Sequence, residues 1–208
     1  MKKIYILLLL CLVFSSATTV FAQAGDYTTS VMRWRASREG IFRNPQSSPI
    51  VFGERFKNFQ GLNWFVINPN YRVIAKFVRT PNEQRFAVPT FGHSETIDIV
   101  KYGTLAFTLE GREFTLAMYQ ILRLRESDPN YLFVPFSDLT SGVESYGGRY
   151  IDFTIPNSDV VALDFNFAYN PDSAYDTRYI CPIPPGENRL PVRVEAGEKL
   201  FDQTLRGQ

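Results

Sequence analysis

The sequence predicts a mainly β protein: an antiparallel sandwich or barrel of about ten short strands, with one N-terminal helix and a long proline-rich C-terminal strap. Short β-branched and aromatic runs alternate with turn residues at intervals of roughly 8–12 residues. No amphipathic segment of helical length separates these runs, which disfavours a parallel α/β sheet. Aromatic residues make up 15% of the chain, with 18 Phe and 11 Tyr, so a packed core can form.

Residues 1–24 have the layout of a secretory signal. Two lysines precede an apolar run over residues 4–14, and Ala-Gln-Ala at 22–24 matches a signal-peptidase site. A transmembrane helix needs roughly 20 apolar residues, so a retained anchor is the weaker alternative. We therefore expect residues 1–24 to be cleaved and residues 25–208 to form a single β-rich domain. Its expected location is periplasmic or secreted, with no membrane contact after cleavage.

The net charge and the cysteine content bear on nucleic-acid binding, disulfide formation and thiol chemistry. Cleavage removes two of the 22 basic residues and leaves 20 against 21 acidic residues, a net charge of −1. Such a balance excludes generic nucleic-acid binding. Cys11 leaves with the signal, so Cys181 is the one cysteine of the mature chain and no intramolecular disulfide can form. The apolar residues around Cys181 predict a buried packing residue rather than a nucleophile.

The mature chain opens with a predicted helix over residues 28–43. Thr28, Thr29 and Ser30 are N-cap candidates, and Asn44-Pro45 ends the pattern. Its four arginines indicate a solvated face, with an anion or partner patch as the alternative.

The residues after the helix have strand character. Glu110-Gly111-Arg112 between two β-rich runs predicts a tight hairpin. The predicted strands are residues 62–65, 71–78, 85–90, 96–102, 104–109, 113–122, 131–136, 149–155, 160–165 and 192–194.

The C-terminal strap comes from residues 164–189, which hold four of the 13 prolines and many Asn, Asp and Tyr residues. Prolines impose an extended course with few ladder hydrogen bonds, so this segment is expected to wrap over the sheet rather than join it. Long ordered loops in compact domains are often functional.

Familiar catalytic and cofactor signatures are absent. The sequence contains no GxGxxG, P-loop, HExxH or GxSxG pattern, and its one histidine, His93, is interpreted as a turn residue. No cofactor and no metal site is predicted. Calcium held by the Asp and Asn oxygens of the C-terminal half is the alternative, although residues 164–175 fail the EF-hand pattern. The sequence leaves open whether the protein is an enzyme.

Polar residues between positions 133 and 190 are the best site candidates. Arg149, between Gly148 and Tyr150, could clamp an external carboxylate or phosphate, or pair with Asp138, Asp164 or Glu187; structural pairing is favoured. The candidate binding residues are Asp138, Tyr146, Arg149, Asp164, Asn166, Asn170, Tyr175, Glu187 and Asn188.

Three motifs in this region carry a resemblance. FVPFSDLTSGVESYGGRYIDF, LDFNFAYNPDSAY and CPIPPGENRLPVRVEAGEK resemble the bacterial domain-of-unknown-function family numbered 1684, uncharacterised exported proteins. The opening MRWRASREGIFRNPQSSPI is also similar, so the resemblance covers about residues 30–199. It implies no established activity. Family members often have a cysteine where this chain has Ser173, so a thiol pair with Cys181 is not available here.

Three functional hypotheses remain. The first is an exported module that binds a small polar ligand, a glycan or a protein on the 133–190 face. The second, the alternative, is a hydrolase of a small polar or glycan substrate that uses two carboxylates. Its pair would come from Asp138, Glu144, Asp152, Asp164 and Glu187. The third is structural: the polar motifs hold the strap on the sheet by satisfying its backbone groups.

Overall fold

The computed structural model describes residues 25–50 and 53–201, so the predicted signal at 1–24 lies outside the described residues. The chain divides after Arg38 into two compact units. Residues 25–43 are helical, which confirms the predicted N-terminal helix. Thr29 and Ser30 lie inside it, where their hydroxyls donate to the carbonyls of Gly25 and Tyr27 at 2.7 Å instead of capping. No helix among the described residues is long and apolar enough to cross a membrane.

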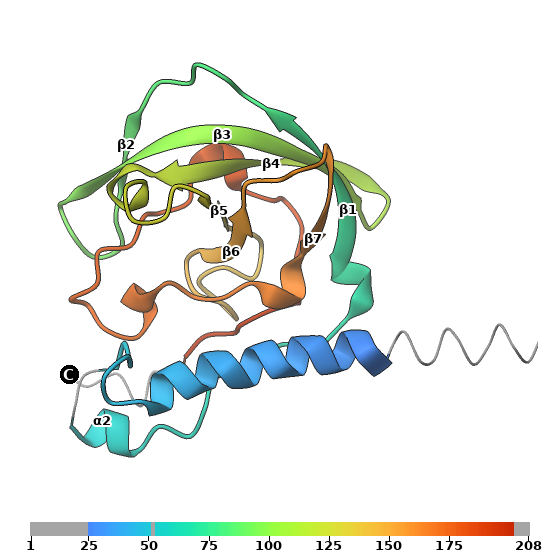
Figure 1. Cartoon of the computed structure of the whole chain (residues 1–208). Helices are drawn as coiled ribbons and strands as arrows, with labels where there is room; N and C mark the ends of the chain where they lie inside the picture. Colours follow the sequence, from blue (N-terminus) through green and yellow to red (C-terminus); the bar gives the residue numbers. More distant parts are fainter. Residues whose placement is uncertain (1–24, 51–52, 202–208) are drawn as a thin grey trace, which may run out of the picture. The chain divides into compact units, whose positions relative to one another are not determined.

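The second unit is built on one curled antiparallel sheet, which confirms the mainly β fold (Figure 1). Its strand order is β6-β5-β4-β3-β1-β7, and β2 pairs with the first half of β3. The strands are β1 (Arg72–Arg79), β2 (Phe86–Pro89), β3 (Thr96–Leu109), β4 (Arg112–Ile121), β5 (Tyr131–Phe136), β6 (Arg149–Thr154) and β7 (Val160–Asp164).

The residues that the structure describes form seven strands, where about ten were expected. The predicted runs 96–102 and 104–109 are one strand, β3, because Gly103 continues the strand instead of ending it. Residues 62–65 contribute a single bridge, between Trp64 and Glu198, and residues 192–194 form no strand. The predicted hairpin is confirmed: Glu110 (φ 50°) and Gly111 (φ 73°) connect β3 to β4 in a turn with two positive φ angles.

A β-bulge at Lys101–Gly103 turns β3 over. Before the bulge Lys101 pairs with Tyr119, and after it Gly103 pairs with Met118. The extra residue moves the odd-numbered side chains of β3 from one face of the sheet to the other. A side chain at Gly103 would place its Cβ 2.4 Å from the Phe77 ring, which explains the glycine.

Because of this change of face, side chains on both faces of β4 are buried, from Leu116 to Ile121. One core contains Leu105, Leu116, Met118, Leu132, Val134, Phe136 and Phe165, together with Leu190, Val192, Val194 and Ala196 from the C-terminal strap. A second, on the other face, contains Val88, Ile97, Ile99, Ala117, Tyr119, Phe133 and Tyr150. A third joins Phe42, Ile50, Phe59 and Leu62 to Ala174, Tyr175 and Phe201.

The C-terminal strap is longer than the predicted 164–189: residues 165–201, orange to red in Figure 1, form no strand. Single bridges connect it to the residue after β2, the residue after β5 and β6, at Thr90–Pro182, Ser137–Arg189 and Tyr150–Tyr169. Its short helices are η3 (Phe165–Phe167), η4 (Asp172–Ala174) and η5 (Gly186–Asn188); the others are α2 (Glu54–Lys57), η1 (Pro69–Tyr71) and η2 (Leu122–Leu124). The strap thus packs on the sheet rather than joining it, as its prolines predict.

Candidate functional site

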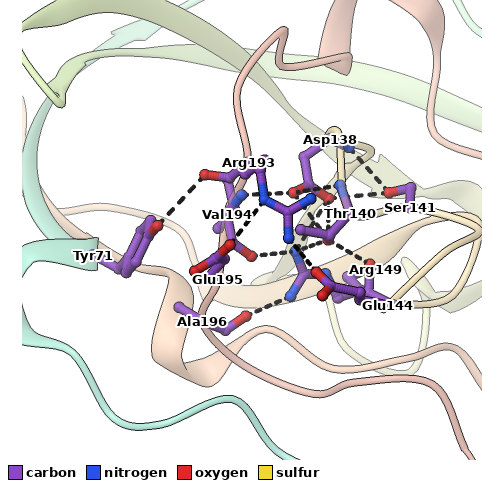
Figure 2. Close-up of polar contacts among 11 residues, drawn as sticks. Tyr71, Asp138, Thr140, Ser141, Glu144, Arg149, Arg193, Val194, Glu195 and Ala196 are labelled. Carbon is purple, nitrogen blue, oxygen red and sulfur yellow. Dashed lines mark hydrogen bonds and ion pairs between the residues drawn. The ribbon is translucent and has the colours of Figure 1, made fainter.

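Asp138 and Arg149 form a buried ion pair at the end of two paired strands. Phe136, which ends β5, pairs with Arg149, which begins β6, and Asp138 lies just beyond. Arg149 Nη2 donates to Asp138 Oδ1 at 3.2 Å, and both side chains are 0% exposed. The guanidinium also donates to the carbonyls of Val194, at 2.9 Å, and Ala196 (Figure 2). Arg149 therefore joins β6 to the strap.

The Asp138 carboxylate organises the turn that follows β5. It accepts from the Thr140 hydroxyl at 2.9 Å, the Ser141 hydroxyl at 3.1 Å and the Val194 backbone N–H at 2.7 Å. Thr140 Oγ1 in turn lies 2.8 Å from Ser145 Oγ, and Ser145 is buried. The turn and the strap thus share one carboxylate (Figure 2).

Arg149 and Asp138 neutralise each other's charge inside the protein, as expected of a structural ion pair. Burial lowers the pKa of Arg149, and the charge of Asp138 opposes that shift. Arginine nevertheless stays protonated in proteins, so the site holds a buried charge pair. The guanidinium carbon also lies 5.1 Å from the Phe136 ring centroid and 5.7 Å from that of Phe65. With both Nη atoms bound to protein groups, the geometry favours the structural pairing of Arg149 over a ligand clamp.

Asn188 connects two strands where their ladder is interrupted. β4 and β5 share one matched pair, Tyr119 and Phe133. Beside it Asn188 Oδ1 accepts from Ala117 N at 2.7 Å, while Nδ2 donates to the carbonyls of Ala117 and Pro135 at 2.8 and 2.6 Å. The side-chain amide thus takes the place of backbone rungs and satisfies buried groups that the sheet leaves unpaired.

Asp164 and Asn166 form a second polar cluster. Asp164 Oδ1 accepts from Asn166 N at 2.9 Å and Asn166 Nδ2 at 3.0 Å. The Asn166 amide also bonds the backbone of Asn68, donating to its carbonyl at 2.8 Å and accepting from its N–H at 3.0 Å. Arg72 Nε lies 4.0 Å from Asp164 Oδ2. This cluster joins the end of β7 to the segment before β1.

A third cluster is organised by Glu198, which is 0% exposed. Its carboxylate accepts from the Asn170 N–H at 3.1 Å and from the Tyr175 hydroxyl. The Asn170 side chain donates to the Lys199 carbonyl at 2.8 Å. Asn170 and Tyr175 are thereby brought together by a residue that was not among the nine candidates.

The last two candidates are more accessible. Glu187 is exposed and accepts from the Tyr119 hydroxyl at 2.5 Å and from Lys101 Nζ at 2.7 Å. Burial raises the pKa of Glu187, but these hydrogen bonds outweigh it, so its pKa lies below the ordinary value. Tyr146 is partly buried, and its hydroxyl donates to the Ser173 carbonyl at 3.4 Å.

A groove of about 500 Å³ lies next to these clusters, lined by Asn63, Trp64, Val143, Glu144, Lys199 and Leu200. Backbone hydrogen bonds hold its three segments together: Lys199 N donates to Asn63 O, and Leu200 N donates to Glu144 O, each at 2.8 Å. A larger groove, of about 630 Å³, lies over β1, β3, β4 and the start of β7, and none of the nine candidates lines either groove.

Residues 57–199, which include all three clusters, match the family described as protein of unknown function (DUF1684). The chain belongs to this family. It is also similar, at 33% identity and a TM-score of 0.65, to the solution structure of an uncharacterized protein from Haloarcula marismortui. That likeness covers 85% of this chain and 96% of the other. No curated protein matches the chain.

The resemblance implies a cysteine at position 173, where this chain has serine. Burial raises the pKa of the Cys181 thiol, and the neighbouring Ser173 acts in the opposite direction and lowers it. The two positions are therefore neighbours in this DUF1684 domain. Cys181 is partly buried, and it is the free cysteine of the described residues.

The nine candidates do not form one site in this DUF1684 domain. Seven are buried, Glu187 is exposed, and Tyr146 lies between. They divide among the three clusters, η5 and the Tyr146 contact. Within the described part of the chain, no group of three or more His, Cys, Asp and Glu side chains could hold a metal ion.

Sequence reasoning did not select the groove residues Asn63, Trp64 and Lys199 as site candidates. Glu144 and Lys199, which line the groove with Trp64, are remote from it in the sequence. No local pattern joins such positions. Glu198 belongs to the third family motif, but that motif does not indicate that its carboxylate bonds both Asn170 and Tyr175.

Proposed function

We propose that the mature chain is an exported binding module that holds a small polar ligand or a glycan in the groove beside Trp64. The observation that carries this proposal is the lining of the groove. Trp64 lines it together with Asn63, Glu144 and Lys199, residues that carry an indole, an amide, a carboxylate and an ammonium group. Binding sites combine apolar contact area with a few converging polar groups, and tryptophan supplies a flat apolar face.

The buried clusters support this function indirectly. Arg149 holds the backbone at Val194 and Ala196, and Glu198 holds Asn170 next to the groove. A lining that is already fixed loses little conformational entropy when a ligand binds. On this proposal the family motifs stabilise the strap, and the groove at its end makes the contact with the ligand.

The carboxylates argue for binding rather than hydrolysis. Asp138, Asp164 and Glu187 are engaged as described above, and Asp152 accepts from the hydroxyls of Tyr131, at 2.8 Å, and Tyr169, at 2.5 Å. The groove is lined by one carboxylate, whereas general acid–base hydrolysis needs two in one cleft. We therefore propose no hydrolase activity.

Native mass spectrometry of the full chain expressed with its N-terminal segment tests the proposal. The protein is taken from the periplasm or the medium without long dialysis. We expect cleavage near Ala24 and a reproducible added mass. Val143→Trp, which fills the groove from a residue 72% exposed, should abolish the added mass. Val78→Trp, on the outer face of β1 and 46% exposed, is the matched control.

Any one of three results contradicts part of the proposal. If the chain stays in the cytoplasm with its predicted signal uncut, the protein is not exported. If the added mass persists in Val143→Trp, the ligand does not bind in the groove. If the mature protein carries no added mass and binds no polar ligand, the groove is not a binding site.

A further inference from the structure

We infer that the groove at Asn63, Trp64 and Lys199 binds an acidic saccharide, with Lys199 recognising the carboxylate of the sugar. This inference rests on the proposed binding function and names the class of its ligand.

The carboxylate of the groove is already neutralised. Glu144 contacts Arg193 Nη2, and Arg193 Nε donates to Glu195 at 2.8 Å (Figure 2). Two carboxylates share that guanidinium, so Arg193 has little capacity left for an anionic ligand. Glu144 keeps lone pairs that can accept from hydroxyl groups.

Lys199 is the cation of the groove that has no such partner. No carboxylate of the described residues lies within salt-bridge distance of it, and its ammonium lies 5.2 Å from the Phe65 ring centroid. Its backbone is held by the bond to Asn63 and by the amide of Asn170. An ammonium group without a carboxylate partner can form a charge-assisted hydrogen bond with an anionic group of the ligand.

The neutral groups of the groove suit a sugar ring. The Asn63 amide donates to the Leu200 carbonyl at 3.1 Å, which leaves its Oδ1 and second N–H for a ligand. Trp64 packs against the third core on one side and lines the groove on the other. A pyranose has C–H groups that pack on an indole and hydroxyls that both donate and accept. An acidic sugar therefore matches the indole, amide, carboxylate and ammonium together.

The probes are a trisaccharide of galacturonic acid and the neutral galactose trisaccharide with the same linkage. The chain has two tryptophans, so Trp34→Phe makes Trp64 the single indole, and its fluorescence reports binding. We expect saturable binding of the acidic trisaccharide, about tenfold tighter than the neutral one because of one charge-assisted hydrogen bond. Calorimetric titration of the unsubstituted chain provides the same comparison without any substitution.

Three variants separate recognition from general charge effects. Lys199→Gln should remove the preference for the acidic sugar and leave the neutral affinity unchanged, and Lys199→Arg should keep it. Lys76→Gln, the same charge change in the larger groove over β1, should leave both affinities unchanged.

Equal affinities for the two sugars, or a preference that survives in Lys199→Gln, overturn the inference. So does an acidic trisaccharide that does not bind at all. If the purified protein then still carries a mass that Val143→Trp abolishes, the groove binds another class of ligand and the proposed function stands. If Val143→Trp does not change that mass, the proposed function itself fails.

Discussion

Replacing Asp138 by alanine would leave the Arg149 guanidinium buried without its carboxylate. The substitution also removes the acceptor of the Val194 N–H and of the Thr140 and Ser141 hydroxyls. Removing one partner of a buried ion pair costs about 3–5 kcal/mol of unfolding free energy. In a domain of this size the melting temperature falls by about 2–4 °C per kcal/mol, so the expected loss is roughly 6–20 °C.

The assay is thermal and urea unfolding followed by circular dichroism, with a double-mutant cycle. Asp138→Ala and Arg149→Met are each strongly destabilising, and together they cost about 1–3 kcal/mol less than the sum of the single changes. Arg85→Gln is the control. It removes an ion pair of 3.9 Å whose side chains are 74% and 50% exposed, so no measurable change is expected. If Asp138→Ala melts with the parent, or if the two costs are additive, the buried pair does not hold the strap.

Four further predictions concern the other contacts of the strap. Asp164→Ala strands two buried donors and should cost about 2 kcal/mol, measured by urea unfolding; unchanged stability would show the cluster to be dispensable. Asn188→Ala removes three hydrogen bonds between β4 and β5 and should cost about 3 kcal/mol or more, with the largest increase in amide exchange near those bonds. Glu187 has a pKa lowered from 4.5 in the folded chain, so its ionised form stabilises the fold above pH 4.5 and this contribution is lost as the pH falls through the folded-state value. Glu187→Gln should therefore lose less stability than the parent on acidification; parallel melting curves against pH would contradict this. Ser173→Cys should form a disulfide with Cys181 on oxidation and raise the unfolding free energy by up to about 2.6 kcal/mol, the loop-closure value for about nine residues; two thiols that remain titratable would show that the positions are too far apart.

The strands could be predicted from the sequence because their signals are local. The run 131–136 is β5, and the runs 71–78 and 113–122 differ from β1 and β4 by one residue at each end. Alternating side chains and a tight glycine turn are properties of neighbouring residues. Gly103 misled the prediction, because a glycine that ends a strand and a glycine at a bulge look alike in sequence. What distinguishes them is the Phe77 ring against its Cα, which comes from the next strand of the sheet.

The nine candidate residues were selected for their chemistry, and their environments could not be predicted. Asp138, Asn166, Asn170 and Asn188 suit a ligand site as well as they suit a buried structural contact, because both uses need donors and acceptors at fixed positions. Burial decides between the two, and burial depends on segments far away in the chain. Asn188 contacts Ala117 across 71 residues, and Arg149 contacts Val194 across 45.

By itself the sequence determined the β class, the N-terminal helix, the hairpin, a proline-rich strap that does not enter the sheet, and the family. These follow from periodicity, turn residues and ordered motifs, all of which are read along the chain. The tertiary structure alone decided that Arg149 pairs with Asp138, that Glu198 organises Asn170 and Tyr175, and that Trp64 meets Lys199 in a groove. The physical reason is that charge pairing and cavities depend on distances through space, which a curled sheet and a packed strap set between residues remote in sequence.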